Sequence, residues 1–352
     1  MKKLDPEARY LIALRQLGPR ARALYDQYGD LMEVLPPSRN KTAKKLGASV
    51  NTVKEVITFV EVWGGPGKNA HRQPDAEGRA PAHFIIPDAH FDRKDRYDGF
   101  KRARRLGEYM AIVYLRCIQR GQELRVVCLG DWWDMVSLCK YDAAKTSFGH
   151  NDVKEDIETG DTAMAVMMDA FSERCAASGV DYTQASDLSF TFTNGNHELR
   201  LDKARSEAAT AALVKGLPTH KSIVEGYGWR FHDYMVPANI DGVAYAHCLP
   251  SGVMGRPIGG VNAAKSLLDK MLVSCVVGHS HTYDLCLRTD AFGNTRFGLV
   301  AGCYYDRVPE YAKTTAQMWW RGVFLLNGVH NGALIRGVSA ITVEDMVDTV
   351  GY

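Results

Sequence analysis

The chain has 352 residues, of which 46% are hydrophobic and 24% are charged, and its formal net charge is only +2. This composition suits one large catalytic domain with room for a small second one, and it excludes a uniformly polycationic protein. Residues 1–68 carry twelve Lys/Arg and seven Asp/Glu, a net of +5, so the remainder carries −3. The asymmetry indicates a basic module joined to a mildly acidic one.

The first 63 residues predict a small helical domain. One helix begins near Pro6 and ends at Gly18, because proline is tolerated in the first turn and Gly-Pro stops a helix. A second helix runs from about Pro19 to Leu35, where two prolines end it.

Residues 40–60 favour a helix, a glycine turn at Gly47 and a further helix that Ser49 is placed to cap. Helical spacing continues through Val50, Val53, Val56, Ile57 and Val60. The pattern resembles the helix-turn-helix segments of DNA-binding regulators, and an ordinary three-helix bundle with a basic surface is the alternative. In the first case, contacts to nucleic-acid phosphates would come from Lys41, Lys44, Lys45 and Lys54.

Residues 64–82 are rich in Gly, Pro and charge, which predicts a linker. Beyond it, apolar runs alternate with helical stretches, as in an α/β domain. The runs are Phe84–Ile86, Leu124–Leu129, Leu188–Thr193, Val243–Ala246 and Cys275–Val277. The clearest helix spans Tyr97–Gln119 and is closed by Gly121. Residues 140–160 predict a long polar connection, and residues 296–341 predict further strands and hairpins.

Each of the five apolar runs is followed at once by a short polar motif. The motifs are Asp88-Ala-His90, Gly130-Asp131-Trp-Trp-Asp134, Gly195-Asn196-His197-Glu198, the lone His247, and Gly278-His279-Ser-His281. Loops that follow successive strands meet at the carboxyl edge of a sheet. Carboxylate, amide and imidazole ligands together suit two divalent ions side by side, which can activate water and bind a phosphate oxygen.

Each motif by itself has an ordinary structural explanation, such as a helix cap, a turn or a buried histidine. Together they are harder to explain in that way, because five of the eleven histidines fall in them. The two oxygens of Asp131 could bridge two cations. His197 could donate a proton to a leaving alkoxide, with Asp134 holding its imidazole in the charged form.

In this order the five motifs resemble those of the calcineurin-like metallophosphoesterase superfamily, over roughly residues 83–306. The resemblance implies an α/β fold for residues 83–352, a β-sandwich of two mixed sheets flanked by helices. It implies that one metal is held by Asp88, His90 and His281, and the other by Asn196, His247 and His279, with Asp131 as the bridge. A hydroxide shared by the metals would attack phosphorus, with His197 as proton donor oriented by Asp134.

The chain departs from the pattern at several positions. Protein phosphatases of the superfamily continue the second motif with Arg-Gly, and the arginine grips the phosphate, whereas Met135 and Val136 stand here. Cys248 replaces a frequent glycine after His247, so His232 is kept as a substitute ligand. Arg256, in the glycine-rich stretch 251–260, could take over phosphate binding, with an ordinary surface loop as the alternative. Trp132 could stack on a base.

The leading hypothesis is a nuclease or other nucleic-acid phosphodiesterase with two divalent metal ions, Mn²⁺ first and Fe, Zn or Ni as alternatives. A small-molecule phosphomonoesterase or cyclic-nucleotide phosphodiesterase is the second, and a non-catalytic DNA-binding regulator is the third. We expect reduced cysteines, with Cys128 and Cys275 buried in strands, and a cytoplasmic protein without a signal peptide or a membrane span. The oligomeric state stays open.

Overall fold

The computed structural model describes residues 19–25, 48–63, 80–139, 149–252, 254–305, 308 and 312–351. The chain divides into two compact units, one of residues 1–79 with 116–121 and one of residues 80–115 with 122–352. Strands and helices make up the second unit, which confirms the α/β class. Most of the predicted linker lies outside the described residues, and Ala82, its last residue, already begins a strand.

The first unit contains helical residues 19–25 and helix α4 (Val50–Trp63). The Ser49 hydroxyl caps α4, accepting a hydrogen bond from the Thr52 N–H at 3.0 Å, as expected. The predicted apolar stripe of α4 is buried except for Val50, at its first turn. Lys54 is exposed. The glycine turn with Lys41, Lys44 and Lys45 lies outside the described residues, so the helix-turn-helix stays a prediction.

The second unit is built on two mixed sheets and two short hairpins. The first sheet has the order β15-β12-β1-β2-β3-β4, in which β1 to β4 run parallel and β12 and β15 antiparallel to their neighbours. Its strands are β1 (Ala82–Ile86), β2 (Leu124–Cys128), β3 (Leu188–Thr193), β4 (Arg230–His232), β12 (Gly322–Leu326) and β15 (Val338–Thr342).

The second sheet has the order β10-β11-β9-β6-β5, with β6, β9 and β11 parallel and an antiparallel strand at each edge. Its strands are β5 (Ala238–Ile240), β6 (Val243–Ala246), β9 (Cys275–Val277), β10 (Tyr283–Thr289) and β11 (Thr295–Ala301). The hairpins are β7 (Pro250–Ser251) with β8 (Arg256–Pro257), and β13 (Val329–His330) with β14 (Ala333–Leu334). All five predicted strands are confirmed to within two residues.

One hydrophobic core lies between the two sheets, where Ile85 and Val127 of the first meet Tyr245, Val276 and Leu299 of the second. Successive side chains of a strand point to opposite faces, so the residue next to Ile85, Phe84, packs instead on Tyr109 of a helix. Every residue of β1 is therefore buried, which explains the apolar run Phe84–Ile86.

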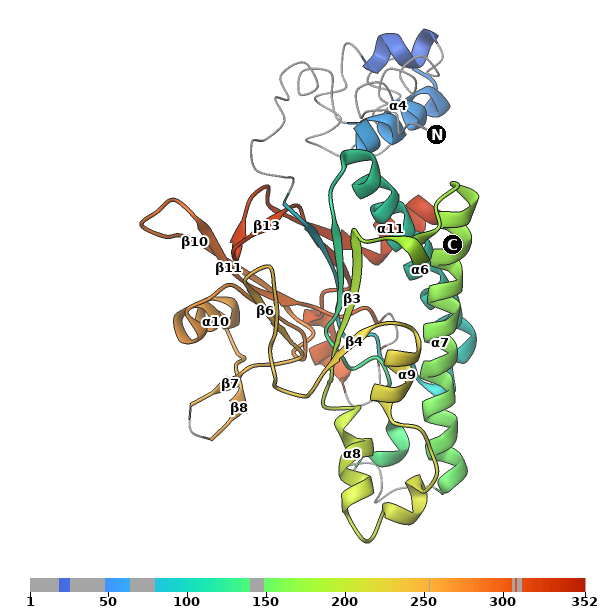
Figure 1. The fold of residues 1–352 in the computed structure, drawn as a ribbon, viewed down its shortest axis with the longest axis vertical. Helices are drawn as coiled ribbons and strands as arrows, with labels where there is room; N and C mark the ends of the chain where they lie inside the picture. The colour runs from blue at the N-terminus through green and yellow to red at the C-terminus, as the bar shows by residue number, and fades with distance from the viewer. Residues whose placement is uncertain are drawn as a thin grey trace. The chain divides into compact units, whose positions relative to one another are not determined.

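Helices α6 (Arg96–Arg120) and α7 (His150–Ala177) lie along the outer side of the first sheet, and α10 (Ala263–Met271) covers the second (Figure 1). Shorter helices are α8 (Leu199–Ser206), α9 (His220–Gly226) and α11 (Val343–Val350). Helix α6 and its end at Gly121, with φ 59°, were predicted correctly. The predicted polar connection is wrong for residues 150–160, which begin α7 and bury Val153, Asp156 and Ile157.

The eight cysteines are free, and Cys128 and Cys275 are buried, as expected. Among the helices that the structure describes, none combines the length and the apolar character that crossing a bilayer requires.

Candidate metal centre

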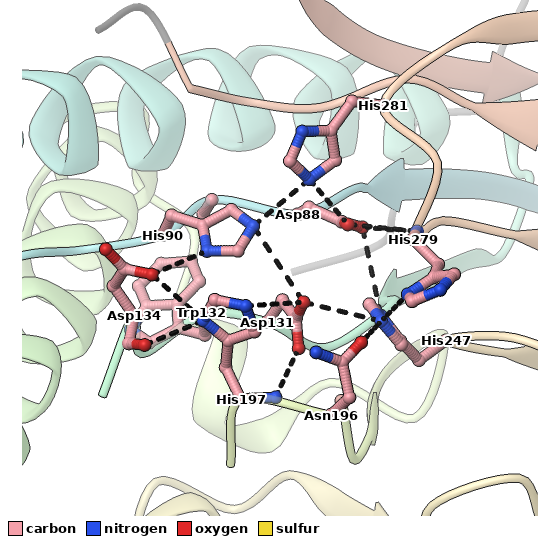
Figure 2. Close-up of polar contacts among 12 residues, drawn as sticks. Asp88, His90, Asp131, Trp132, Asp134, Asn196, His197, His247, His279 and His281 are labelled. Atoms are coloured by element: carbon pink, nitrogen blue, oxygen red, sulfur yellow. Dashed lines mark hydrogen bonds and ion pairs between the residues drawn. The ribbon is translucent and has the colours of Figure 1, made fainter. Parts of the chain in front are cut away.

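The five motifs converge at one edge of the two sheets. Three of them follow the parallel strands β1, β2 and β3 of the first sheet, and two follow the parallel strands β6 and β9 of the second. Parallel strands end on the same side, so their loops meet there. Figure 2 shows the Asp, Asn and His side chains of these loops pointing toward one another.

Asp88, His90 and His281 form one group. His281 Nε2 lies 3.2 Å from Asp88 Oδ2 and 3.2 Å from His90 Nε2. All three side chains are buried. The Asp88 carboxylate also accepts the backbone N–H of His279 at 2.9 and 3.1 Å, which ties the loop after β1 to the loop after β9.

Asn196, His247 and His279 form a second group, in which the other two side chains surround His247 Nε2. His247 Nε2 lies 2.9 Å from Asn196 Oδ1 and 3.1 Å from His279 Nδ1. The other nitrogen of His247, Nδ1, lies 3.0 Å from the Leu129 carbonyl oxygen, which can only accept. Nδ1 therefore carries the proton of the neutral ring, and the lone pair of Nε2 points at the group.

The Asp131 carboxylate lies between the two groups. Its Oδ2 is 3.4 Å from His247 Nε2 and 3.8 Å from His90 Nε2. Its Oδ1 accepts the backbone N–H of His197 at 2.9 Å. Burial raises the pKa of Asp131, but His247, His197 and His90 lower it more, so the pKa lies below its usual range.

His197 and Asp134 form a close pair beside the first group. His197 Nδ1 lies 2.9 Å from Asp134 Oδ1 and 2.7 Å from the Asp134 carbonyl oxygen. Asp134 Oδ1 is also 3.3 Å from His90 Nδ1. Burial lowers the pKa of His197, but Asp131 and Asp134 outweigh it and leave the pKa raised. Burial likewise opposes ionisation of Asp134, whose two histidine partners still hold its pKa well below the usual value.

The donor set fits divalent cations. Asn196 Oδ1 and Asp131 Oδ2 are acceptors, and they face the lone pair of His247 Nε2 with no hydrogen between them, an arrangement that a cation would satisfy. In the described part of the chain, three sets of Asp and His each bring their ligand atoms within 4.8 Å of one another. These sets are Asp88 with His90 and His281, His90 with Asp134 and His197, and Asp88 with Asp131 and His247.

The backbone of the site is unusually strained. Ten non-glycine residues in the described part of the chain have a positive φ, and five belong to these loops. The five are His90, Asp131, Met135, His279 and His281, with φ between 46° and 70°. Left-handed backbone costs an L-residue about 1–2 kcal/mol. Such conformations persist only where the surroundings enforce them, and they concentrate at functional sites.

Glycines in two of the motifs make room for the carboxylates. A Cβ on Gly195 would lie 2.1 Å from Asp131 Oδ1, and one on Gly278 would lie 2.1 Å from Asp88 Oδ1. Any other residue at either position would displace a carboxylate that the site gathers.

Glu198, to which the sequence assigned no role, holds the loop after β2 in place. One carboxylate oxygen accepts the N–H of Trp132 and Trp133 at 2.6 and 3.1 Å. The other accepts the N–H of Asp131 and Gly195, both at 3.0 Å. Burial and the charge of Asp131 raise the pKa of Glu198, whereas its four N–H donors favour the anion. Because neither oxygen has room for a proton beside two donors, we treat Glu198 as a carboxylate.

Two more side chains at the site were missed. Arg200 Nη2 lies 3.0 Å from His197 Nε2. The partly exposed ring of Trp319 stands edge-on to His281, with the ring centroids 4.4 Å apart. For Arg200, the one sequence signal was its spacing of three residues from His197, which places the two side chains one helical turn apart.

Two predicted substrate contacts are not supported. The Trp132 ring is fully buried and donates its Nε1–H to the Gly160 carbonyl oxygen at 2.9 Å, so it offers no face to a base. Arg256 is exposed on β8, and among the described residues its side chain makes no hydrogen bond or ion pair with the cluster. His232, the substitute ligand, is the last residue of β4. Within the described part of the chain, its ring makes no contact with the cluster.

The nine motif residues are thus together, and His247 is among the most deeply buried of them. No model of a known protein family matches the sequence, and no curated protein matches it.

Proposed function

We propose that this protein is a dinuclear-metal phosphodiesterase of the calcineurin-like metallophosphoesterase type, and that it acts on nucleic acid. The observation that carries the proposal is the position of Asp131 Oδ2 between two groups of oxygen and nitrogen donors. Two sheets with a shared core and helices on their outer sides are consistent with the fold of that superfamily.

Asp88, His90 and His281 would hold one ion, Asn196, His247 and His279 the other, and Asp131 both. Bound there, two divalent ions would supply Lewis acidity toward a phosphoryl oxygen and lower the pKa of a water molecule. Imidazole, amide and carboxylate ligands suit Mn, Fe, Zn or Ni, and Mn²⁺ is our first choice.

His197 would serve as the proton donor to the leaving oxygen. Asp134 engages its Nδ1 through both a carboxylate and a carbonyl oxygen, so Nε2, which faces Arg200, is the atom that would meet the substrate. The paired carboxylate favours the imidazolium and fixes the ring. General acid help of this kind contributes about 10²–10⁴ in rate.

Two features support a nucleic-acid substrate. The first 68 residues carry a net charge of +5, and Lys54 projects from α4 into solvent. Met135 takes the place where phosphoprotein phosphatases carry their phosphate-gripping arginine, which argues against that branch.

A substrate panel on the purified Mn²⁺-loaded chain tests the proposal. We expect turnover of bis-p-nitrophenyl phosphate and of single-stranded or duplex DNA to exceed turnover of p-nitrophenyl phosphate. A strong preference for the monoester would replace the nuclease assignment by a phosphomonoesterase.

The same panel on His197→Ala tests the proton donor. We expect kcat to fall by about 10²–10⁴, while metal content stays unchanged. His330→Ala, which removes an exposed histidine on β13, is the matched control. Equal absence of turnover in the original chain and in His197→Ala would favour a non-catalytic DNA-binding regulator.

A further inference from the structure

We propose that Arg200 binds the phosphate group of the substrate, through the edge of its guanidinium that contacts His197. The inference deepens the proposed function and rests on it. Arg200 would take the phosphate-binding role for which the sequence analysis suggested Arg256.

The start of α8 places Arg200 beside the reacting groups. The helix begins directly after the Gly195–Glu198 motif, and the Arg200 N–H donates to the His197 carbonyl oxygen at 3.2 Å. Residues three apart lie on the same face of a helix, so the two side chains project together. Arg200 is partly buried, which leaves an approach for a ligand.

Two backbone carbonyls fix the direction of the guanidinium. Arg200 Nη1 donates to the carbonyl oxygens of Asp134 and Met135 at 3.0 and 3.3 Å. These contacts hold Nη1 against the loop, and because the guanidinium is planar they restrict the direction in which its other nitrogens point. The carbonyls belong to the loop that carries Asp131, so the guanidinium is fixed relative to the proposed metal ligands.

The guanidinium edge that carries Nη2 contacts His197. Arg200 Nη2 lies 3.0 Å from His197 Nε2, the atom that would donate a proton to the leaving oxygen. The guanidinium edge therefore faces the place where the phosphate group of the substrate would lie. A phosphate oxygen can accept from both groups at once, and it would replace the Arg–His contact by two charge-assisted hydrogen bonds.

Charge also distinguishes Arg200 from Arg93, Arg96 and Arg102. Arg93, Arg96 and Arg102 each pair with a carboxylate, at distances from 2.5 to 3.8 Å. Among the residues that the structure describes, Arg200 forms no ion pair within 4.0 Å. A partly buried guanidinium without a carboxylate partner is suited to an anionic ligand.

The contact with Met135 also accounts for a departure in the sequence. Met135 stands where protein phosphatases of the resembled superfamily have their arginine. Here a guanidinium reaches the backbone of that position from α8 instead.

Binding of inorganic phosphate to the Mn²⁺-loaded full chain, measured by calorimetry, tests the proposal without requiring turnover. We expect Arg200→Gln to raise the phosphate Kd by about 10- to 100-fold, since hydrogen bonds to charged groups contribute on that scale. Arg200→Lys, which keeps the charge but not the fork, should fall between Arg200→Gln and the original chain. Lys203→Ala, which removes an exposed cation from the same helix, should leave the Kd unchanged.

Kinetics give a second readout. KM for bis-p-nitrophenyl phosphate should rise in Arg200→Gln by a factor similar to that in Kd, and added guanidinium ion should partly restore an Arg200→Ala variant. Metal content and thermal unfolding of each variant show whether the site is still intact. If Arg200→Gln loses its metals, the comparison is made on Arg200→Lys.

An unchanged phosphate Kd in a metal-loaded Arg200 variant would overturn the proposal, as would a failure of the original chain to bind phosphate. Absence of turnover in a chain that binds phosphate through Arg200 would instead overturn the proposed function. The two failures are therefore distinguishable.

Discussion

Two loops of the second unit invite comparison because each follows a strand that ends at a motif. They are the β2 loop (residues 130–139) and the β7–β8 hairpin (residues 250–257). Each was predicted to contribute one substrate contact, through Trp132 and Arg256 respectively. In the structure six of the ten residues of the β2 loop are buried and none is exposed, whereas Arg256 and Met254 of the hairpin are exposed, Met254 to 79%.

The β2 loop is held by hydrogen bonds with Glu198 and with helix α7. Glu198 accepts hydrogen bonds from three of its N–H groups, and the buried Asp156 of α7 accepts one from Ser137 at 2.8 Å. Trp132 and Trp133 donate to carbonyl oxygens of α7 at 2.9 and 3.0 Å. The loop can therefore keep Asp131 and Met135 in left-handed backbone. Precise placement of a side chain follows from such anchors, and an exposed hairpin has few of them.

The largest loss of stability should come from Glu198→Gln, which weakens the anchoring of the β2 loop. One amide oxygen can still accept two N–H groups, but the amide nitrogen then faces the other two as a donor. Leaving two buried N–H groups unpaired costs about 1–3 kcal/mol each, so we expect a loss of about 4 kcal/mol in the free energy of unfolding. Urea denaturation measures it.

Metal content of Glu198→Gln should fall as well, because Asp131 lies in the loop that Glu198 holds. Glu158→Gln on the exposed side of α7 removes one surface ion pair with Lys154 at 3.5 Å and should cost less than about 1 kcal/mol. If Glu198→Gln behaves like Glu158→Gln, the β2 loop is held by something else.

The next effect concerns pH. Burial raises the pKa of Asp156 to about 6, although Ser137 and Arg93 oppose the rise. The folded-state pKa is above the unfolded one, so folding gains from Asp156 below about pH 4 and loses that gain as pH rises through 6. At about 1.4 kcal/mol per pKa unit, roughly 3 kcal/mol is lost between pH 4 and 7.

Asp156→Asn should remove that contribution. The difference in unfolding free energy between the variant and the original chain should shift in favour of the variant by up to about 3 kcal/mol from pH 4 to pH 7. Denaturation at several pH values tests this, and parallel curves for the two proteins would contradict it. Any fixed cost of placing an amide beside Arg93 cancels in the comparison.

The strands and the nine motif residues were predictable because the information is local. Leu188–Thr193 is β-branched and aromatic, and Asn196 and His197 follow it within four residues. The β2 loop was predictable only in part. Glu198 is 66 and 65 residues away from Trp132 and Trp133, whose N–H groups donate to it, and no local pattern indicates that contact. The start of α7 was missed because its polar residues hid the buried positions Val153 and Ile157.

A smaller effect is expected from Gly160→Ala, where α7 meets the β2 loop. A Cβ on Gly160 would lie 2.0 Å from Cδ1 of the fully buried Trp133 ring, which has no space to move. Overpacking costs about 1–3 kcal/mol, and alanine returns up to about 1 kcal/mol of helix propensity. We expect a net loss of about 1–2 kcal/mol.

Gly226→Ala, in α9, is the matched control, because a Cβ there meets nothing within 4 Å. Thermal unfolding should show a lower Tm for Gly160→Ala, whereas that of Gly226→Ala should be unchanged or slightly higher. A higher Tm for both variants would mean that the Trp133 ring can shift to make room for the added methyl group.

The smallest effect should come from Arg256→Ala in the β7–β8 hairpin. Arg256 is exposed, and surface substitutions of this kind stay within about 0.5 kcal/mol of the original stability. KM for bis-p-nitrophenyl phosphate should change by less than about twofold, in contrast to Arg200→Gln. A tenfold rise in KM for Arg256→Ala would show that the hairpin reaches the substrate. In that case Arg200 of α8 would share the phosphate group with Arg256, and the role that the sequence analysis gave to Arg256 would be restored.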